Sequence, residues 1–499
     1  MSTSERIPQP RLDKLQSLKN RGVDPYPARF RRTQTNAEAV ALLVKQEEAA
    51  TQPAEVSVAG RITAIRGMGK LAFIDLLDNS GKLQLYVNKS KLDELSALLL
   101  GDLDIGDFLG ASGVLVRTRT LEPSVDVKTL TVLTKSLLPL PEKWHGLQDT
   151  EKRYRQRYLD LISNPDVREV FRSRSRIISA LRRYLDQSNF LEVETPILQP
   201  SAGGALARPF ITHHNALGCD FYLRIALELH LKRLLVGGFD RVYEIGRVFR
   251  NEGIDTRHNP EFTMLEAYQA YADYQDIMRL TEEMIGSVVK DLTGGYTVPF
   301  GDHVLDFTPP WKRLGLRQAI LEASGIDYNA YPDTASLQAE MGRLGYDFDP
   351  TRDRGRLIDD LLGTFLEPKL VQPVFLVDYP IDMSPLAKNR PDCPNTVERF
   401  EAYAGCMEIA NAFSELNDPL EQARRFAAQS ESRAAVCRAD GEETEVIDDD
   451  FLTALEHGMP PTGGLGVGID RLTMLLTSQP SIREVILFPA LKDKEQSLC

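Results

Sequence analysis

Three segments of this chain carry residues whose types and spacing suit the binding of an anionic ligand. In the first, Arg250 follows an apolar run that contains Glu244, and a polar loop separates it from a second run, FTMLEAY, at 262–268. The two runs predict antiparallel strands, with Glu266 and Tyr268 on one face. A charge inside an apolar strand is costly to bury unless it faces a ligand. Arginine suits phosphate and carboxylate, so an inward Arg250 would clamp an anion; the alternative is a surface hairpin of paired charges.

The second segment is rich in glycine and reads GGLGVGIDR at 463–471. It has neither the GxxxxGK[ST] pattern of a P-loop nor the GxGxxG pattern of a dinucleotide-binding fold. Alternating glycines in a strand leave one face without side chains, so a flat ligand or another backbone can approach closely. Asp470 is predicted to cap the helix that follows, and Arg471 to project from its first turn.

The third segment, RFEAYAGCMEIANAFSEL at 399–416, alternates like a single strand. Glu401 and Glu408 are separated by an odd number of residues, so a flat strand would place them on opposite faces. A bulge near 404–405 would restore a common face. Two carboxylates beside polyphosphate would ligate Mg²⁺, and the alternative is a mixed edge strand. One face at period two carries Asn411, Phe413 and Glu415.

Composition bounds the class of protein to which these segments belong. The chain has 499 residues and a net charge of −13, which predicts several domains and argues against a nucleic-acid partner. Residues 1–32 and 143–183 are nevertheless locally basic, so they are either RNA-binding faces or solvated helix surfaces. No long apolar run, signal-peptide core or CxxC pair is visible. We therefore expect a cytoplasmic chain with no membrane span, disulfide framework or zinc site.

The elements around the three segments predict several structural parts. Residues 11–50 are rich in helix formers. Residues 56–133 contain about five short strands between turn residues, a pattern typical of an oligonucleotide-binding barrel. A proline-marked linker and an amphipathic helix at 166–187 follow. Pro196 then falls in an extended segment, where it demands an edge, a bulge or a subunit boundary. Residues 273–370 are predicted to be mainly helical.

Three of these pieces occur in the order and spacing of the motifs of class II aminoacyl-tRNA synthetases, which the chain resembles. FLEVETPIL is similar to motif 1, VFRNEG…RHNPEFTMLEAY to motif 2, and GLGVGIDRLTMLL to motif 3. The strings GLQDTEKRYRQRYLDLI, GGALARPFITHHNAL and NAFSELNDP resemble those of the bacterial lysyl-tRNA synthetases. The resemblance extends from about Arg11 to Leu491.

The resemblance implies an α+β fold with a defined order of domains. The expected parts are an N-terminal helical extension at 1–50, a five-stranded OB-fold β-barrel that binds the anticodon at 51–140, a linker at 141–155, and a class II catalytic domain, an antiparallel sheet flanked by helices, at 156–499. Within the catalytic domain we expect motif 1 at about 189–200, motif 2 at about 241–271, a helical insertion at about 310–370 and motif 3 at about 461–478.

The resemblance also implies a reaction: ATP activates L-lysine to lysyl-adenylate, and the lysyl group passes to the 3′ end of tRNA(Lys), with release of AMP and pyrophosphate. Arg250 and Arg471 would be catalytic, and Mg²⁺, up to three ions with ATP, would be ligated by Glu401 and Glu408. Phe262 would stack beneath the adenine. The other residues implied at ATP are Glu252 and Asn259 at the adenine edge, and Arg257 and His258 at the outer phosphates.

A pocket for lysine needs carboxylates at the far end and an apolar or aromatic wall along the carbon chain. The resemblance assigns Glu266, Tyr268 and Glu415 to the side-chain amine. It assigns Phe413 to the wall, Asn411 to a polar contact, Glu228 and Gly204 to the α-amino group, and Arg250 to the carboxylate. We expect uncharged amino acids of similar length to be rejected, because the buried carboxylates would be left unpaired.

The barrel is expected to bind the anticodon, with Phe73 stacking a base and Arg66 and Gln84 as polar readers. Two departures from the family pattern stand out. Residues 118–125, TRTLEPSV, lack the usual glycine turn, which puts that contact in doubt. Leu227 replaces a proline that often precedes the pocket glutamate, a change that we expect to be tolerated.

Three other functions remain open at this point. The first is a relative that activates asparagine or aspartate; the acidic residues at the amine end weigh against it, since an aspartate enzyme would need cations there. An inactive relative that serves as an RNA-binding or regulatory module should have lost Arg250, Arg471 or the Glu401/Glu408 pair, and all are present. A relative that modifies a protein usually lacks the barrel. The expected partners are tRNA(Lys), L-lysine, ATP and a second copy of the chain in a homodimer.

Overall fold

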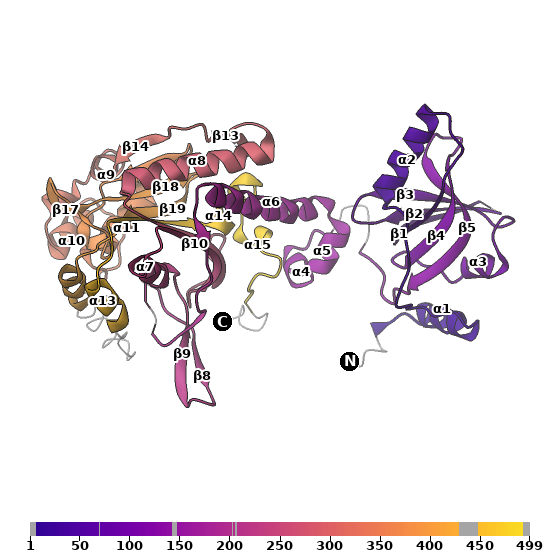
Figure 1. Cartoon of the computed structure of the whole chain (residues 1–499), viewed down its shortest axis with the longest axis horizontal. Coiled ribbons are helices and arrows are strands. Elements are labelled where there is room, and N and C mark those ends of the chain that lie inside the picture. The colour runs from indigo at the N-terminus through magenta and orange to yellow at the C-terminus, as the bar shows by residue number, and fades with distance from the viewer. Residues whose placement is uncertain are drawn as a thin grey trace. The chain divides into compact units, whose positions relative to one another are not determined.

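The structure is a computed structural model of the chain, and it describes residues 6–68, 70–141, 147–201, 203–204, 207–428 and 448–492. The chain forms two compact units, Met1–Gln148 and Asp149–Cys499 (Figure 1). Part of the expected linker, 142–146, lies outside the described residues. The C-terminal end of the expected linker forms the helix α4 (Thr150–Arg155), which belongs to the second unit.

Two helices precede the barrel in the first unit, α1 (Gln9–Asn20) and α2 (Asn36–Glu48). The prediction of helix throughout 11–50 was therefore wrong for 21–35. Pro25 and Pro27 fall in this stretch, and each proline removes a backbone donor and disfavours helix in the residue before it. The second helix begins at a capping box, in which Thr35 and Glu38 each accept a hydrogen bond from the other's backbone N–H.

A closed barrel of five strands fills the first unit, in the order β1-β2-β3-β5-β4. The strands are β1 (Glu55–Met68), β2 (Leu71–Leu77), β3 (Lys82–Asn88), β4 (Phe108–Arg117) and β5 (Pro123–Thr134), with α3 (Glu94–Leu99) between β3 and β4. Alternate residues point inward, so Val58, Ile74, Leu85 and Val125 are fully buried. This confirms the predicted five-stranded barrel.

An eight-stranded sheet forms the centre of the second unit, in the order β14-β15-β18-β19-β20-β11-β10-β6. Its strands are β6 (Leu191–Glu192), β10 (Arg241–Phe249), β11 (Glu261–Ala270), β14 (Lys312–Gly315), β15 (Val374–Val377), β18 (Arg399–Ala404), β19 (Met407–Ser414) and β20 (Thr462–Gly468). The strands from β15 to β10 run antiparallel to their neighbours, and the edge strands β14 and β6 pair in parallel. The sheet confirms the predicted antiparallel core.

Residues 398–415 form a hairpin, so the prediction of a single strand was wrong. The chain turns with positive φ at both residues of 405–406, and β19 returns antiparallel to β18. A register shift in this pairing marks a bulge. As a result, Glu408 lies opposite Tyr403, two residues along from Glu401. The two glutamates therefore share one face of the sheet, although the turn contributes as much to this as the bulge does.

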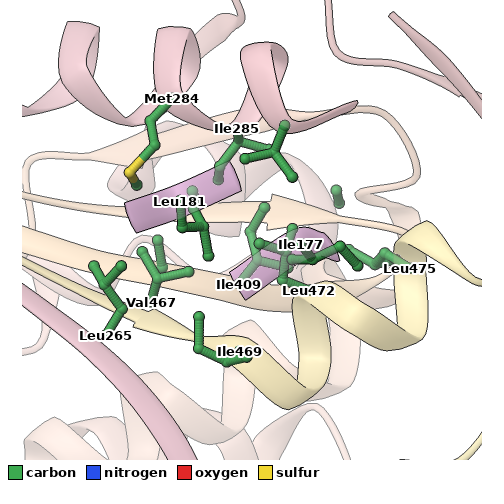
Figure 2. Close-up of a cluster of buried hydrophobic side chains, with 14 of the residues drawn as sticks. Ile177, Leu181, Leu265, Met284, Ile285, Ile409, Val467, Ile469, Leu472 and Leu475 are labelled. Carbon is green, nitrogen blue, oxygen red and sulfur yellow. The ribbon is translucent and has the colours of Figure 1, made fainter. Parts of the chain in front are cut away.

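Helices cover the other face of the sheet and bury the main hydrophobic core. These helices are α6 (Pro165–Gln187), α8 (Tyr274–Thr293), α14 (Ile469–Leu476) and α15 (Ile482–Val485). Figure 2 shows side chains from the helices and from three strands meeting in this core: Ile177, Leu181, Met284, Ile285, Leu265, Ile409 and Val467. Because successive strand residues point to opposite faces, the neighbouring Glu266 and Gly466 point away from this core.

Shorter elements complete the second unit. They are α5 (Arg157–Ser163), β7 (Leu198–Gln199), β8 (Ile211–His214), β9 (Cys219–Leu223), α7 (Glu228–Val236), β12 (Thr297–Phe300), β13 (His303–Asp306), α9 (Leu316–Ser324), α10 (Thr334–Arg343), α11 (Arg354–Leu361), β16 (Asn389–Arg390), β17 (Cys393–Val397) and α13 (Asp449–Glu456). The helices α9 to α11 bury a core of their own, in the region predicted to be helical. In Figure 1, β8 and β9 project from the body of this unit. No helix among the described residues is long and apolar enough to cross a membrane.

Candidate active site

On the face of the sheet opposite the helices α6, α8, α14 and α15, strand register places the residues in two rows. One row, across β19, β20 and β11, is Phe413, Gly464 and Tyr268, and the next is Asn411, Gly466 and Glu266. Glycine occupies the middle strand in both rows. A strip of bare backbone therefore runs between one pair of side chains from β19 and another from β11, on the face that the period-two pattern predicted.

One of these glycines makes room for the chain's own side chains. A Cβ on Gly464 would overlap Oε1 of Glu415 and lie 2.6 Å from the ring of Tyr268. At Gly466 the nearest atom to such a Cβ is the terminal methyl of Met264, at 3.3 Å. The expectation that the glycine face is open along its whole length is corrected accordingly: Gly464 accommodates pocket side chains, and the bare strip lies at Gly466.

Three buried glutamates meet beside this strip. Glu266 accepts hydrogen bonds from the backbone N–H of Leu227 at 3.0 Å and from the hydroxyl of Tyr268 at 2.9 Å. Glu228 is the first residue of α7, and Glu415 follows β19 directly. Burial, with a smaller contribution from the charge of Glu228, raises the pKa of Glu266 to about 7. Burial also raises the pKa of Glu415 well above its usual value.

The other residues assigned to lysine line the same place. Gly204 has a φ of +89°, which favours glycine, and a Cβ there would lie 3.6 Å from Cβ of Glu228. The side-chain oxygen of Asn411 accepts a hydrogen bond from Arg399 at 3.0 Å. Phe413 lies on the same strand face two residues further along. The structure thus brings these residues together on and beside one face of the sheet. Arg250 lies near enough for its charge to lower the pKa of Glu266, against the effect of burial.

Arg250 is placed where it can meet an anion. Its guanidinium lies 5.2 Å from the centre of the Phe262 ring, and its Nε donates to the carbonyl of Ile225 at 3.4 Å. Within the described part of the chain, no carboxylate forms an ion pair with it. Burial lowers its pKa, whereas the nearby charges of Glu252, Glu408 and Glu266 oppose that shift. A largely desolvated arginine without a counter-ion is a strong site for phosphate or carboxylate.

Arg471 and the two cations assigned to the outer phosphates, Arg257 and His258, each have a partner within the protein. Arg471 donates to the side chain of Glu408 at 3.0 Å, and its other nitrogen lies 3.1 Å from Nε2 of His258. The other ring nitrogen of His258 lies 2.8 Å from Asp255. Arg257 forms an ion pair with Glu367, which lies outside motif 2. Bound polyphosphate would have to replace these carboxylates.

The residues assigned to the adenine edge differ in their surroundings. Glu252 is exposed, and its backbone N–H donates to the carbonyl of Arg250 at 2.9 Å. Asn259 is buried; its amide donates to the carbonyl of Glu261 at 2.6 Å and accepts from the backbone of Ala490 at 3.1 Å. In this arrangement the side chain of Asn259 ties the motif 2 loop to the C-terminal segment.

Glu401 and Glu408 lie on one face and differ in how they are held. The carboxylate of Glu401 accepts hydrogen bonds from the hydroxyls of Tyr379 and Tyr403, each at 2.7 Å, and from Arg399 at 2.5 Å. Partial burial and the charge of Glu401 raise the pKa of Glu408. Among the described residues, no group of three His, Cys, Asp or Glu side chains could hold a metal. A pair of carboxylates still fits Mg²⁺ when nucleotide oxygens and water complete its shell.

Asp470 does not cap its helix, so that prediction was wrong. The N-cap of α14 is Gly468, and no side chain caps it. Asp470 instead accepts hydrogen bonds from the backbone N–H of Thr263 and from Arg174, both at 2.7 Å. Its carboxylate thereby joins α14 to β11 and α6, which fixes where the neighbouring Arg471 emerges.

Glu244 does not face a ligand, contrary to the prediction for charges within this strand. Its carboxylate accepts hydrogen bonds from Arg224 at 2.6 Å and from the hydroxyl of Thr195 at 2.7 Å. A Cβ on the neighbouring Gly246 would overlap the guanidinium of Arg224. Glycine there makes room for this buried ion pair, which joins the residue after β9 to β10, while the hydrogen bond from Thr195 joins the segment after β6 to the same strand.

The residues predicted at the anticodon share one face of the barrel. Register places Arg66 opposite Phe73 and Phe73 opposite Tyr86. Arg66 donates two hydrogen bonds to Asp75, at 2.8 and 3.1 Å. The rings of Phe73 and Tyr86 are 5.6 Å apart between centres. Gln84 lies opposite Asp75 in the same register and is largely buried.

The turn that lacks glycine nevertheless forms, with leucine in its place. Leu121 has a φ of +62° and is 71% exposed. Its N–H donates to the carbonyl of Thr118 at 2.9 Å, and the N–H of Thr118 donates to the carbonyl of Glu122 at 3.1 Å. The turn between β4 and β5 therefore keeps a glycine-like backbone at the expense of strain in a leucine.

Sequence reasoning missed three residues that lie in or beside these sites. Lys232 contacts the glutamate pocket, and its spacing of four residues from Glu228 on a helix was the available signal. Tyr86 lies two residues from Gln84, so the period of the strand could have placed it on the anticodon face. Asp359 of α11 has no local signal; burial and the charges of Glu401 and Glu408 raise its pKa to about 6.

Comparison with known proteins agrees with this fold. The family of tRNA synthetases class II (D, K and N) matches residues 149–492, and the OB-fold nucleic acid binding domain matches 56–133. The fold is that of this class of synthetase, and the candidate site lies within the residues that its family model matches.

Curated relatives narrow the class further. A lysine–tRNA ligase of Dehalococcoides mccartyi is 62% identical over 97% of this chain and 97% of its own. Those of Moorella thermoacetica and Roseiflexus castenholzii are each 52% identical, over 97% and 98% of this chain and 98% and 99% of their own. The chain therefore belongs to the lysine–tRNA ligase family of the class II tRNA synthetases.

Proposed function

We propose that this enzyme uses ATP to activate L-lysine as lysyl-adenylate and then transfers the lysyl group to the 3′ end of tRNA(Lys). The observation that carries the proposal is the division of charge across one sheet face. Three buried glutamates end the pocket, and Arg250, without an acidic partner, lies near them. A free amino acid with a long cationic side chain matches this arrangement, whereas aspartate would place a carboxylate among carboxylates.

The first step needs alignment more than proton transfer. The carboxylate of lysine attacks the α-phosphorus in line, the bond to the bridging oxygen breaks, and pyrophosphate leaves with the electron pair. No general base is required, because the nucleophile is already an anion. Arg250 would contact both the lysine carboxylate and the α-phosphate and would stabilise the charge that develops between them. Phe262, with Arg471 on the opposite side, would hold the adenine.

The remaining ATP contacts follow from the same placement. Glu252 and Asn259 are assigned to the adenine edge, and Arg257 and His258 to the outer phosphates. Glu401 and Glu408 would hold Mg²⁺ with the phosphates, and we expect up to three ions with ATP. When bound, the metal neutralises phosphate charge. In the second step the terminal adenosine hydroxyl of the tRNA takes the lysyl group and AMP leaves.

The barrel would recognise the anticodon. Phe73 would stack a base, and Arg66 and Gln84 would contact base edges. The placement of Phe73 beside Tyr86 on a single face supports a stacking role. We further propose that the enzyme acts in the cytoplasm, where its tRNA substrate is found.

A homodimer is proposed from the segment around Pro196. Leu191, Ile197, Leu198 and Ile211 are each between 43% and 62% exposed, and they come from neighbouring parts of the second unit. Exposed apolar side chains in such number mark an interaction surface. Equilibrium sedimentation of the protein tests this: a dimer is expected, and Ile197→Lys with Leu198→Lys should yield monomers.

Pyrophosphate exchange tests the proposed function directly. Purified enzyme, ATP, Mg²⁺ and radiolabelled pyrophosphate are incubated with each of the twenty amino acids in turn. Strong exchange is expected with lysine and little with any other. Strong exchange with aspartate or asparagine would refute the choice of lysine, and exchange with no amino acid would refute the enzymatic role. Charging of total tRNA then tests the transfer step.

A further inference from the structure

A lysine of the chain itself is buried inside the glutamate pocket. Lys232 of α7 has no exposed side-chain surface. Its ammonium donates to Glu228 at 2.5 Å and forms an ion pair with Glu415. The ring of Phe413 lies 5.4 Å from this ammonium and that of Phe451 lies 5.8 Å from it. The amino group is therefore enclosed by two carboxylates and two aromatic rings.

Lys232 connects the two ends of the proposed lysine site. Glu228 begins α7 and is assigned to the α-amino group, whereas Glu415 follows β19 and is assigned to the side-chain amine. Both oxygens of Glu415 lack a well-oriented hydrogen bond, although Lys232 lies beside one of them. The ammonium of Lys232 is thus the one cation of the described residues that contacts both carboxylates and fixes their separation.

The charge of Lys232 balances the charges of the proposed pocket against those of free lysine. Glu228, Glu266 and Glu415, when ionised, contribute three negative charges, and Lys232 reduces them to two. Free lysine brings two ammonium groups, and Arg250 neutralises its carboxylate. A pocket with three uncompensated carboxylates would hold one charge in excess, and a buried excess charge is costly.

We propose that Lys232 is a positioning residue: a fixed counter-cation that holds Glu228 and Glu415 at their binding separation and matches the charge of the pocket to the two ammonium groups of lysine. This rests on the proposed function, and it assigns Lys232 no contact with ATP or with the reacting atoms. The residue acts on the substrate through the two glutamates.

The other groups packed around Lys232 are consistent with this role. From β11, the charge of Glu266 adds to the upward shift that burial causes in the pKa of Glu415. Burial, together with the charges of Glu266 and Glu415, raises the pKa of Tyr268. The ring of Phe451, from α13, lies near the ammonium of Lys232. Asp448, at the start of that helix, accepts a hydrogen bond from Arg233 at 2.7 Å. Burial lowers the pKa of Lys232, but Glu228 and Glu415 together outweigh burial and raise it, so Lys232 stays charged. Its charge in turn opposes the upward shift in the pKa of Glu415.

The test replaces Lys232 by a side chain of similar length without charge, Lys232→Met. In lysine-dependent pyrophosphate exchange, the KM for lysine should rise by about tenfold or more, since ionised glutamates become rarer and less well placed. The KM for ATP should stay within about twofold and kcat should change less than the KM for lysine. The defect should shrink as the pH is raised from about 6.5 to about 9, because the glutamates then ionise without help.

A matched control and a charge-balanced variant make the result decisive. Lys290→Met introduces the same substitution on the exposed side of α8 and should leave both KM values unchanged. In a Glu228→Gln background, Lys232→Met should raise the KM for lysine much less than in the wild type, since one acid and one cation then disappear together. The double variant also avoids the buried charge imbalance. If Lys232→Met alone does not fold, the double variant can still be compared with Glu228→Gln.

Several results would overturn the proposal. One is an unchanged KM for lysine in Lys232→Met. Another is a lower KM, which would mean that Lys232 competes with the substrate ammonium. A third is a rise in the KM for lysine that does not depend on pH. A fourth is additivity, in which Lys232→Met raises the KM for lysine as much in the Glu228→Gln background as in the wild type. Failure of the proposed function is distinct, because the wild-type enzyme would then show no lysine-dependent exchange at all.

Discussion

The proposed lysine pocket and the proposed anticodon face of the barrel use the same side-chain types in opposite surroundings. In the pocket, Glu266 and Glu415 are at most 4% exposed, and their charges are shielded by protein alone. On the barrel, the side chain of Arg66 is 52% exposed and already paired with Asp75. An ion pair in water contributes little, whereas an unbalanced charge in a dry pocket is decisive. We therefore expect large, selective effects from the pocket and modest, graded effects from the barrel.

The largest effect is expected from Arg250→Ala, which should lower adenylate formation about 100-fold to 1,000-fold while the protein stays folded. The reason is that Arg250 forms no ion pair with any carboxylate of the described residues, so its charge is available to the substrates. Lysine-dependent pyrophosphate exchange measures the loss, and circular dichroism monitors the fold. A folded variant with near-normal exchange would show that Arg250 has no part in the mechanism, and the expected contrast between pocket and barrel would then fail.

The second effect concerns pH and the pocket alone. The pKa of Glu266 is raised to about 7, and only its ionised form attracts an ammonium group. Lysine affinity should therefore rise as the pH increases through 7, by about tenfold between pH 6 and pH 8, and binding below pH 7 should release a proton. Calorimetry in buffers of different ionisation enthalpy measures that proton. Glu266→Gln should flatten the slope between pH 6 and pH 8 and reduce the release, and an unchanged slope in this variant would contradict the assignment.

On the barrel side, Phe73→Ala should weaken tRNA charging by about tenfold through a higher KM for tRNA, because one stacked base loses its platform. Pyrophosphate exchange without tRNA should be unchanged. The pair of assays separates the two regions. Equal losses in both would show that the barrel substitution reaches the catalytic unit and that the two regions are not independent.

The smallest effect is expected from Leu121→Gly, which should stabilise the barrel by about 1 kcal/mol or less. Leucine at a φ of +62° is strained, and glycine relieves that strain while adding some entropy to the unfolded chain. Hydrogen exchange of the β4 and β5 amides measures the change locally. Faster exchange in the variant would mean that the leucine side chain stabilises this turn in a way that its exposure does not suggest.

Period and turn signals were sufficient for most of the fold. Period-two spacing predicted that Glu266 and Tyr268 share one face of their strand and that the alternating glycines of 463–468 leave one face of theirs bare. The sheet register agrees and shows that these two faces are the same one. The same reasoning failed at 398–415, where the Gly405-Cys406 turn between two alternating runs was taken for a bulge within one strand. It also treated Glu244 as a ligand-facing charge, because its partner Arg224 is twenty residues away and no local pattern shows the pair.

The site was harder to predict in the places where contacts come from remote elements. The motifs named the pocket glutamates, but not Lys232, whose role depends on the approach of α7 to the end of β19. Likewise, Asp470 was expected to cap a helix, whereas its partners are Thr263 and Arg174, from a strand and a helix far apart in the sequence. Spacing reveals which residues share an element; it does not reveal which elements pack together.

The absence of a side chain at Gly464 has a consequence for attempts to reprogram the enzyme toward other amino acids. The volume that a side chain would occupy there is already filled by Glu415 and Tyr268. A larger residue at this position therefore cannot be used to narrow the pocket for a smaller substrate. Useful diversity for directed evolution lies in those two side chains and in Lys232, varied together. Libraries that randomise the glycine are expected to return mainly misfolded protein.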